Sequence, residues 1–206
     1  MNYRVWEKLA HKYNGLWVQK YSLAPTRREV KKIVLPIIKS HPNIKILEIG
    51  CGTGQLIQEI SAENERISYQ GIDAAENMIE IAQRNNKNKN VQFKAVSIED
   101  YETKETFDLI ICTHAFPYFP QKAEMLKKIA ALCNRGAKVL IVSASNNSWK
   151  DRMTTFLLKA TTSKAEYLSI KDMLQLSGNA LLKCLDVRII KEKRYMPTIA
   201  LFYLER

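Results

Sequence analysis

The sequence ILEIGCGTGQL at residues 46–56 decides the fold of this 206-residue chain. Gly50, Gly52 and Gly54 lie within five residues there, directly behind an apolar run with the length of a buried strand. A glycine-rich turn between a strand and a helix lets a ligand approach the backbone, and the helix N-terminus offers free N–H groups to anionic atoms. The stretch therefore predicts a nucleotide-type binding loop.

The spacing of these glycines excludes two common nucleotide loops. A dinucleotide fingerprint needs G-x-G-x-x-G, but Gln55 or Ile57 stands where its third glycine would be. A phosphate-binding P-loop fails as well, because no Gly-Lys-Ser/Thr follows. What remains is the pattern E-x-G-x-G-x-G, which begins at Glu48.

Short apolar runs alternate with amphipathic ones from Lys45 onward. This rhythm indicates an α/β fold with crossover units and a mostly parallel sheet that is covered on both faces. We expect strands at 45–49, 67–72, 91–96, 107–112 and 137–143, and helices at 54–64, 76–86 and 121–134.

The N-terminal region depends on two local signals. Thr26 and Glu29 form a capping-box pattern, which predicts that a helix starts at Thr26. Pro36 should end or kink that helix.

The rhythm changes again after Ser143. We expect a helix at 149–160 and a second helix that opens at Ser169 and closes near Gly178. The last residues, 186–206, indicate two long strands around a turn at Met196 and Pro197, so the sheet should end in an antiparallel hairpin.

Further motifs, together with the glycine loop, resemble the class I S-adenosylmethionine-dependent methyltransferases. They are GIDAAENMIEIAQRN at 71–85, VSIEDY at 96–101, FDLIICTHAFPYF at 107–119 and LCNRGAKVLIV at 132–142. The resemblance runs from about Lys45 to the C-terminus. It implies one domain, 1–206, with a Rossmann-like, doubly wound, mostly parallel seven-stranded sheet, a helical N-terminal cap at 1–40 and a helical insert at 144–180.

The resemblance also implies the cofactor, S-adenosyl-L-methionine, and the residues that hold it. Asp73 should bind both ribose hydroxyls, although an acid there can also cap a helix. Met78 and Ile98 should sandwich the adenine. Many members have an acidic residue where this chain has Ser97, so the adenine contact can come instead from Glu99, Asp100 or the backbone near Ile98. The full cofactor set is Tyr13, Glu48, Gly50, Cys51, Gly52, Thr53, Gly54, Asp73, Ala74, Met78, Ser97, Ile98, Glu99 and Thr113.

Methyl transfer from a sulfonium is an in-line displacement, so much of the catalysis can be positioning. If the acceptor carries a proton, His114 is the candidate base in the loop after the fourth strand. His114 can equally order that loop or border the methionine moiety. Tyr118 can orient the acceptor or pack inside.

The N-terminal segment is aromatic and basic. Trp6, Tyr13, Trp17 and Tyr21 fall about four residues apart, which is the spacing of one helix face. In the methyltransferases that the chain resembles, an A-x-x-Y stretch such as Ala10 to Tyr13 folds over the cofactor as a lid. The acceptor-binding set would then be Trp17, Lys20, Tyr21, Arg27, Arg28 and Phe116, and the second wall would be Trp149, Met153, Phe156, Leu157 and Ala160.

The formal net charge of +11 is concentrated at the two ends of the chain. Residues 1–40 carry nine basic against two acidic side chains, and 144–206 carry eleven against six. This distribution indicates an acidic substrate, nucleic acid or an anionic surface near the ends, or simply a solvated lysine-rich surface.

We expect an enzyme that transfers a methyl group from S-adenosylmethionine to a small molecule, either anionic or phenolic. The alternatives are an RNA methyltransferase, a non-catalytic cofactor-binding protein and, more distantly, a nicotinamide oxidoreductase. The run at 149–160 could also rest on a membrane and admit a lipid-like acceptor.

No apolar run approaches the about 20 residues of a membrane-spanning helix, and residues 1–13 lack the apolar centre of a signal peptide. We therefore expect a cytoplasmic protein. The four cysteines are widely scattered, so we expect neither a metal site nor a disulfide framework.

Overall fold

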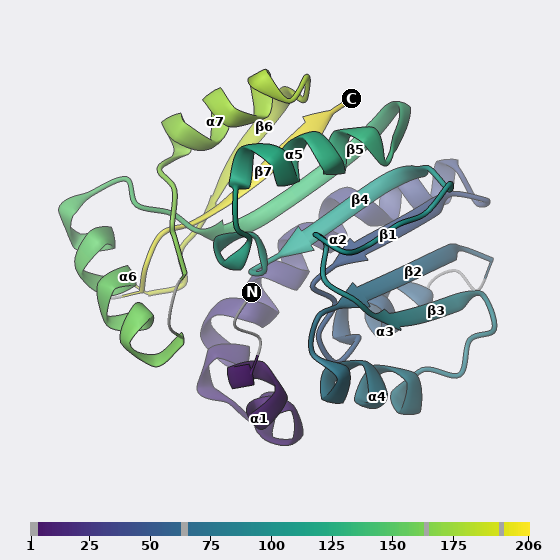
Figure 1. Cartoon of the computed structure of the whole chain (residues 1–206), viewed down its shortest axis with the longest axis horizontal. Coiled ribbons are helices and arrows are strands. Elements are labelled where there is room, and N and C mark those ends of the chain that lie inside the picture. The colour runs from purple at the N-terminus through teal and green to yellow at the C-terminus, as the bar shows by residue number, and fades with distance from the viewer. Residues whose placement is uncertain (1–3, 63–65, 163–164, 194–195) are drawn as a thin grey trace.

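The computed structural model describes residues 4–62, 66–162, 165–193 and 196–206, and its centre is a seven-stranded sheet (Figure 1). The strand order is β3-β2-β1-β4-β5-β7-β6. The strands are β1 Lys45–Ile49, β2 Ser68–Asp73, β3 Val91–Ala95, β4 Phe107–Thr113, β5 Cys133–Ala144, β6 Lys183–Ile190 and β7 Ile199–Glu205. This arrangement confirms the predicted Rossmann-like fold and its C-terminal hairpin, since β7 runs antiparallel to both of its neighbours, β5 and β6.

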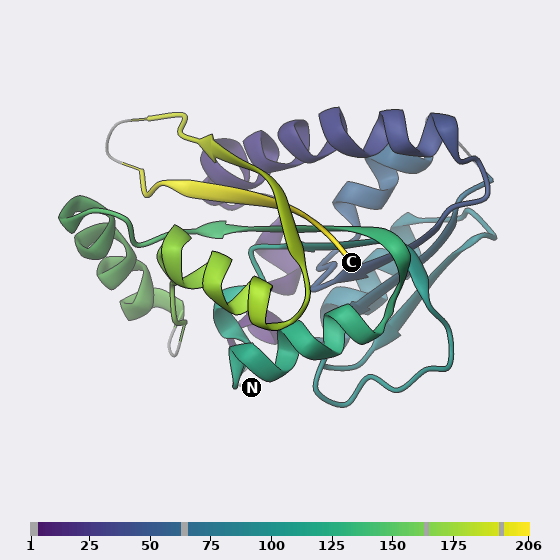
Figure 2. The same ribbon diagram turned by 90° about the horizontal axis from the view of Figure 1, so that it is seen from above.

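Helices cover both faces of the sheet (Figure 2). One face carries α2 and α3, and the other carries α5 and α7. The α-helices are α1 Arg4–Tyr13, α2 Ala24–Ser40, α3 Gln55–Ser61, α4 Glu76–Asn85, α5 Lys122–Ala131, α6 Trp149–Thr162 and α7 Ile170–Asn179. A π-helical turn, η1 Gln19–Leu23, and a 3-10 turn, η2 Phe116–Tyr118, complete the described elements.

The central strands bury side chains on both faces. Leu109 of β4 packs among the residues of α2 and α3, whereas the next residue, Ile110, packs among those of α5 and α7. Successive side chains of a strand point to opposite faces, so a strand covered on both faces must be apolar throughout. This explains the continuous apolar runs in the sequence.

The order of the strands reverses beside β1. The chain moves outward from β1 through β2 to β3, then returns to place β4 on the other side of β1. In open parallel sheets, ligands bind at the carboxyl ends of the strands where the order reverses. The glycine loop after β1 therefore lies at the expected ligand edge.

The predicted start of the second helix is wrong, and the helix does not end at Pro36. α2 begins at Ala24, with Pro25 in its first turn, because η1 leads directly into it in helical conformation. Thr26 therefore lies inside the helix and caps nothing. The helix also continues through Pro36 to Ser40. A proline inside a helix costs about 3 kcal/mol, and the buried side chains on either side of it, such as Val34 and Ile38, offset that cost.

The N-terminal aromatic residues do not share one helix. α1 ends at Tyr13, a turn follows at Asn14 and Gly15, and Tyr21 belongs to η1. The four-residue spacing was therefore misleading beyond Tyr13. In the C-terminal region, by contrast, Ser169 caps α7 as predicted, since its side chain accepts a hydrogen bond from the Asp172 N–H. None of the described helices is both long enough and apolar enough to cross a membrane.

Candidate functional site

The loop that follows β4 packs closely against the glycine loop. Gly50 has φ +74°, and a Cβ added there would lie 2.3 Å from the Ala115 Cβ. Two carbons cannot approach so closely, so a side chain at position 50 would clash with Ala115. Gly52, at φ +53°, faces the ring of Tyr13, where an added Cβ would lie 3.7 Å from Cε1. The tight turn thus joins β1, the β4 loop and the N-terminal lid at one place.

Asp73 lies at the end of β2 beside this loop. Its carboxylate accepts hydrogen bonds from the Gly52 N–H and the Ala75 N–H, both at 2.9 Å. Burial raises the pKa of Asp73, and the N–H groups of Ala75 and Gly52 partly oppose that rise. The side chain therefore both orders the glycine loop and begins α4, and it faces the main cavity.

Glu48 is more deeply buried than Asp73, and 2% of its surface is exposed. Its carboxylate accepts a hydrogen bond from the Tyr69 hydroxyl. Burial raises the pKa of Glu48 well above its ordinary value, the nearby Asp73 adds to this, and Arg27 opposes it. The β1–β2 register explains the partner: Glu48 pairs with Gly71, so Tyr69, two residues earlier, points to the same face.

Two adjoining hollows open at this edge of the sheet. The main cavity lies between the lid, the ends of β1, β2 and β4, and the β6–β7 link. A smaller glycine-loop hollow reaches toward Arg27, Glu48, Cys51, Thr53 and Gln55. The walls of both include Tyr13, Leu23, Gly50, Gly52, Thr113 and His114, so one elongated ligand could occupy both.

The predicted adenine residues lie together in the main cavity. Ala74, Met78, Ser97 and Ile98 all line its wall. The Ser97 hydroxyl is engaged with Asp100, at 2.8 Å from its carboxylate. Glu99 does not line the cavity, but its Oε2 atom is buried and makes no hydrogen bond with the described residues. Gly54 lies in neither wall; it packs against Phe93 and Ala82 below the loop.

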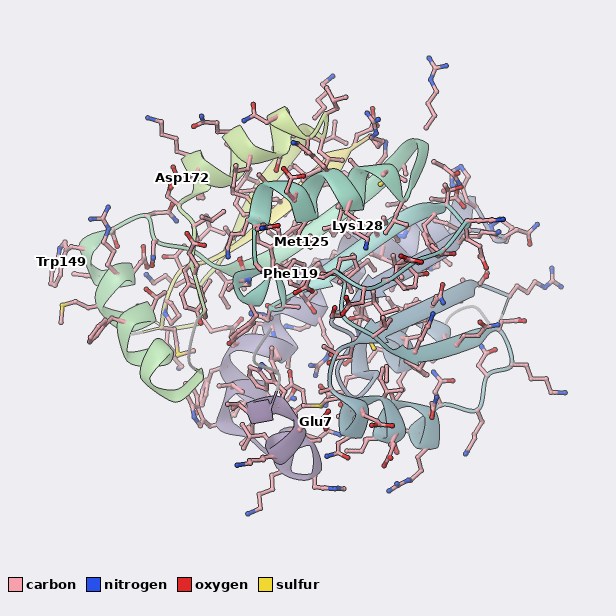
Figure 3. The ribbon with its side chains drawn as sticks, viewed as in Figure 1. Glu7, Phe119, Met125, Lys128, Trp149 and Asp172 are labelled. Atoms are coloured by element: carbon pink, nitrogen blue, oxygen red, sulfur yellow. The ribbon has the colours of Figure 1, made fainter. Side chains whose placement is uncertain are left out.

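The N-terminal lid closes against α4 and the β4 loop. The Glu7 carboxylate accepts hydrogen bonds from the Glu76 N–H at 2.6 Å and the Asn77 N–H at 3.0 Å, so α1 caps the N-terminus of α4. Figure 3 shows Glu7 at this junction. The Trp6 ring meets Tyr13 and Tyr118 edge-on, with centroids 6.1 and 5.5 Å apart. Tyr13 therefore covers the glycine loop, which is the geometry of a lid.

His114 is held in a strained and partly buried position. It has φ +60°, its N–H donates to the Val142 carbonyl at 2.6 Å, and its Nε2 lies 2.8 Å from Thr26 Oγ1. The ring lines both hollows. Burial, assisted by the positive charge of Arg27, lowers the pKa of His114 to about 4. A neutral imidazole that resists protonation is a weak general base, so this geometry favours an ordering role.

The titration of His114 gives a stability prediction. The unfolded chain binds a proton at His114 near pH 6.5, whereas the folded protein does not until about pH 4. Stability should therefore fall as the pH drops from about 6.5 toward 4. Between pH 7 and pH 5, we expect the wild type to lose roughly 1–2 kcal/mol more unfolding free energy than His114→Gln, measured by urea denaturation. Equal losses in the two proteins would contradict the lowered pKa of His114.

Several predicted acceptor residues do not reach the cavity. Lys20 and Tyr21 of η1 lie outside both hollows, and Arg28 pairs with Glu192 at 2.7 Å on the surface. The reason is the change from α1 through η1 to α2, which turns these side chains outward. Phe116 is buried in the core against Phe119 and also lies outside the cavity wall. Trp17 and Tyr118 do line the cavity.

Arg27 is placed differently from the prediction. It lines the glycine-loop hollow and not the main cavity, and it donates to Glu59 at 2.7 Å and to Gln55 at 2.9 Å. Its guanidinium thus stands on the side of Glu48 and the glycine loop.

The second wall also differs from the prediction. Trp149, Met153 and Phe156 of α6 do not line the cavity, and the side chains of Leu157 and Ala160 lie outside the described residues. The wall comes instead from Ala144 and Tyr167, on either side of α6 in the chain, and from Met196 and Pro197.

Residues 40–200 match the family described as the methyltransferase domain. The chain belongs to the methyltransferase domain family. The match covers strands β1 to β6, the glycine loop and the β4 loop, and it confirms the family that the glycine loop and the later motifs predicted.

Relatives of this methyltransferase domain act on different acceptors. The malonyl-[acyl-carrier protein] O-methyltransferase of Bacillus cereus is 30% identical over 125 residues, which are 59% of this chain and 46% of the relative. The ubiquinone biosynthesis O-methyltransferase of Bordetella bronchiseptica is 26% identical over 107 residues, 50% of this chain and 44% of the relative. The chain thus spans about half the length of these relatives.

Solved structures show the same fold. Magnesium protoporphyrin IX methyltransferase from Synechocystis PCC 6803 with bound SAH superposes with a TM-score of 0.72 at 17% identity, covering 93% of this chain and 88% of that chain. The putative methyltransferase of Haloferax volcanii, in complex with the activator Trm112, has a TM-score of 0.70 at 13% identity, covering 79% and 82%.

Some residues of the methyltransferase site had no sequence signal. Thr26 contacts His114, Tyr69 contacts Glu48, and Asn14 accepts a 2.8 Å hydrogen bond from the Thr53 hydroxyl. Each partner is distant in sequence, and only strand order and lid placement bring it to the site. Tyr69 alone could have been found, from the parallel register of β1 and β2.

The residues present fit S-adenosylmethionine. The backbone of Gly52 faces the Tyr13 ring, and a side chain at Gly52 would narrow the space between them. The carboxylate of Asp73 faces the main cavity and can accept hydrogen bonds there. Met78 and Ile98 supply apolar walls suited to a flat base. These features together suit one elongated cofactor with a ribose and a flat base.

Proposed function

We propose that the protein is an S-adenosylmethionine-dependent O-methyltransferase that acts on an apolar, phenol-like small molecule. The observation that carries the proposal is the shared cavity. Gly50, Asp73 and Met78 form one part of its wall, and Trp17, Tyr118 and Tyr167 form another. A cofactor on the first part would therefore face an acceptor on the second.

The acceptor is apolar because of what lines the cavity. Among the described residues, the wall contains no lysine or arginine, and Asp73 is its only charged side chain. The wall includes two tryptophans, the aromatic residues Tyr118, Phe119 and Tyr167, and Met196. An anionic acceptor would meet no charge partner there, so we set that part of the expectation aside. The names of the relatives, as O-methyltransferases, support oxygen as the acceptor atom.

The residues of this chain act mainly by binding and orienting. When bound, the cofactor supplies an electrophilic methyl group on a sulfonium sulfur. Asp73 binds the ribose hydroxyls, and Arg27 attracts the carboxylate of the amino-acid end in the glycine-loop hollow. Trp17 and Tyr118 would hold the acceptor close to the methyl group. As the new carbon–oxygen bond forms and the carbon–sulfur bond breaks, the hydroxyl proton of the acceptor would pass to solvent. His114 stays neutral and fixes the β4 loop through Thr26 and Val142.

The experiment that tests the proposal has two stages. Calorimetric titration should show binding of S-adenosylhomocysteine in preference to NAD. Radiolabelled methyl transfer into a cell extract, fractionated into metabolites, lipids, RNA and protein, should then label apolar metabolites or lipids. Label in RNA would favour an RNA methyltransferase instead, and tight cofactor binding without any label would point to a non-catalytic protein.

Trp17 should contribute to binding of the acceptor but not to binding of the cofactor. Trp17→Ala should raise the acceptor KM by about tenfold, because it removes a large aromatic wall, while S-adenosylhomocysteine affinity changes less than about twofold. Tyr21→Ala is the matched control, since Tyr21 is aromatic and near in sequence but lies outside the cavity. An equal rise in KM for both variants would contradict the assigned acceptor wall.

A further inference from the structure

Helix α6 is amphipathic, but its polar face is turned toward the protein and its apolar face toward solvent. In its first half, 149–156, the residues turned toward the protein are polar: Asp151 and Thr155 are 3% and 1% exposed. The residues turned outward are large and apolar: Trp149, Met153 and Phe156 are 66%, 58% and 73% exposed. At 100° per residue these three fall in one stripe about 60° wide. We call them the α6 stripe.

Hydrogen bonds hold the helix in this orientation. The Thr155 hydroxyl donates to the Asn146 side chain at 2.6 Å, and the Asp151 carboxylate accepts from the Thr198 N–H at 3.0 Å and the Ser148 hydroxyl at 2.8 Å. These bonds join α6 to the segments around it through its polar face. The α6 stripe therefore cannot turn inward without breaking them.

The helix also projects from the rest of the protein. Figures 1 and 2 show α6 beyond the ends of β5 and β7, apart from the helices that cover the sheet. Figure 3 shows Trp149 at the outer edge of the molecule, with its side chain directed away from the sheet. The stripe is thus an exposed apolar surface at the edge of the molecule.

The charge around the stripe is positive. Lys150 and Arg152 are exposed on either side of it, and Lys150 lies over the Trp149 ring at 5.7 Å. Lys191 and Lys193, in the link before β7, are also exposed, and Lys191 contacts the Thr198 that docks α6. A second copy of this chain, with a net charge of +11, would be repelled. An anionic surface would be attracted.

We propose that the α6 stripe docks the protein on an anionic lipid membrane. Tryptophan is suited to the membrane interface, methionine and phenylalanine enter the acyl boundary, and the flanking lysines and arginine reach phospholipid head groups. Ala144 and Tyr167, which flank α6 in the chain, line the main cavity, so docking brings the cavity close to the lipid. Delivery of an apolar acceptor from the membrane rests on the proposed function; the docking itself does not.

The test is vesicle flotation of the full chain without cofactor or acceptor. Wild type should float with vesicles of equal parts phosphatidylcholine and phosphatidylglycerol, and at least about tenfold less with phosphatidylcholine alone. The triple variant Trp149→Ser, Met153→Ser, Phe156→Ser should lose at least about tenfold of this binding. So should Lys150→Glu, Arg152→Glu.

Matched controls separate the stripe from general effects. Leu181, Leu185 and Ile189 are also exposed, at 68%, 41% and 53%, so their triple serine variant removes a comparable apolar set elsewhere. Lys87→Glu, Lys89→Glu reverses two exposed charges in the loop after α4. Both controls should bind vesicles within about twofold of wild type, and all variants should bind S-adenosylhomocysteine alike. The proposal would be overturned if the wild type did not float with anionic vesicles, or if the stripe variant floated as the wild type does. It would also be overturned if the stripe substitutions left vesicle binding unchanged and only converted a dimer of this protein into a monomer.

Discussion

Replacing Gly50 with alanine should give the largest loss of stability of any single methyl addition in this chain. The new Cβ would lie 2.3 Å from the Ala115 Cβ, and the backbone there is at φ +74°. The positive φ costs about 1 kcal/mol, and the overlap adds about 1–3 kcal/mol because the β4 loop must move. We expect a Tm lower by roughly 5–12 °C. S-adenosylhomocysteine affinity should fall at least about 100-fold, since the displaced loop carries His114 and the cavity wall.

Two variants separate the overlap from the backbone effect. Gly136→Ala is the control, because Gly136 has φ +78° but an added Cβ would meet nothing within 4 Å. It should lower the Tm by only about 2–4 °C and leave cofactor binding unchanged. Gly50→Ala combined with Ala115→Gly removes the clashing methyl and leaves the Ala115 Cα at 3.7 Å. That double variant should recover most of the binding, and a failure to recover would show that the contact with Ala115 is not the cause.

Asp73→Asn should weaken S-adenosylhomocysteine binding by about 100-fold with little change in fold. The asparagine keeps one carbonyl oxygen for the Gly52 or Ala75 N–H, but it loses the negative charge that strengthens hydrogen bonds to two ribose hydroxyls. The affinity is measured by isothermal titration calorimetry. The unfolding free energy should fall by about 1–3 kcal/mol, since the new amide NH2 group faces one of the two backbone N–H donors that the carboxylate satisfied.

Asp108→Asn is the matched control for Asp73. Asp108 also accepts a backbone hydrogen bond, from the Lys45 N–H at 3.0 Å, but it does so at the opposite ends of β1 and β4. Cofactor affinity should stay within about twofold of wild type in this variant. If both variants weakened binding equally, Asp73 would be a residue that orders the loop and not one that contacts the cofactor.

The strand-and-glycine part of the protein was readable from local patterns. Apolar runs separated by amphipathic ones specify a parallel sheet covered on both faces, and the match of β1 to 45–49 was complete. The positions of Gly50, Gly52 and Asp73 followed from strand ends, because the carboxyl ends of neighbouring parallel strands meet at one edge. The N-terminal helices were less predictable, since η1 joins α2 without a cap and buried side chains keep α2 helical through Pro36.

Charge was the least reliable guide to the acceptor. Lys20 and Arg28 are close in sequence to residues that line the main cavity, but they do not line it themselves. Arg27 lines the glycine-loop hollow. Long basic side chains are stable wherever they reach water, so their position in the sequence says little about which pocket they face. The same limit applied to α6, whose apolar residues suggested an inner wall but lie outward.

By itself, the sequence determined the α/β fold and the glycine loop, because these depend on local periodicity and on spacing along single strands and turns. The methyltransferase family came from the resemblance of its motifs to known members. Tertiary structure alone decided that Thr26 meets His114, that Asn14 meets Thr53, and that α6 turns its polar face inward. The contact between Asn146 and Thr155, which orients α6, joins residues 9 positions apart. The contact between Thr26 and His114 joins residues 88 positions apart. They depend on strand order and on how the lid and insert dock, which no local pattern encodes.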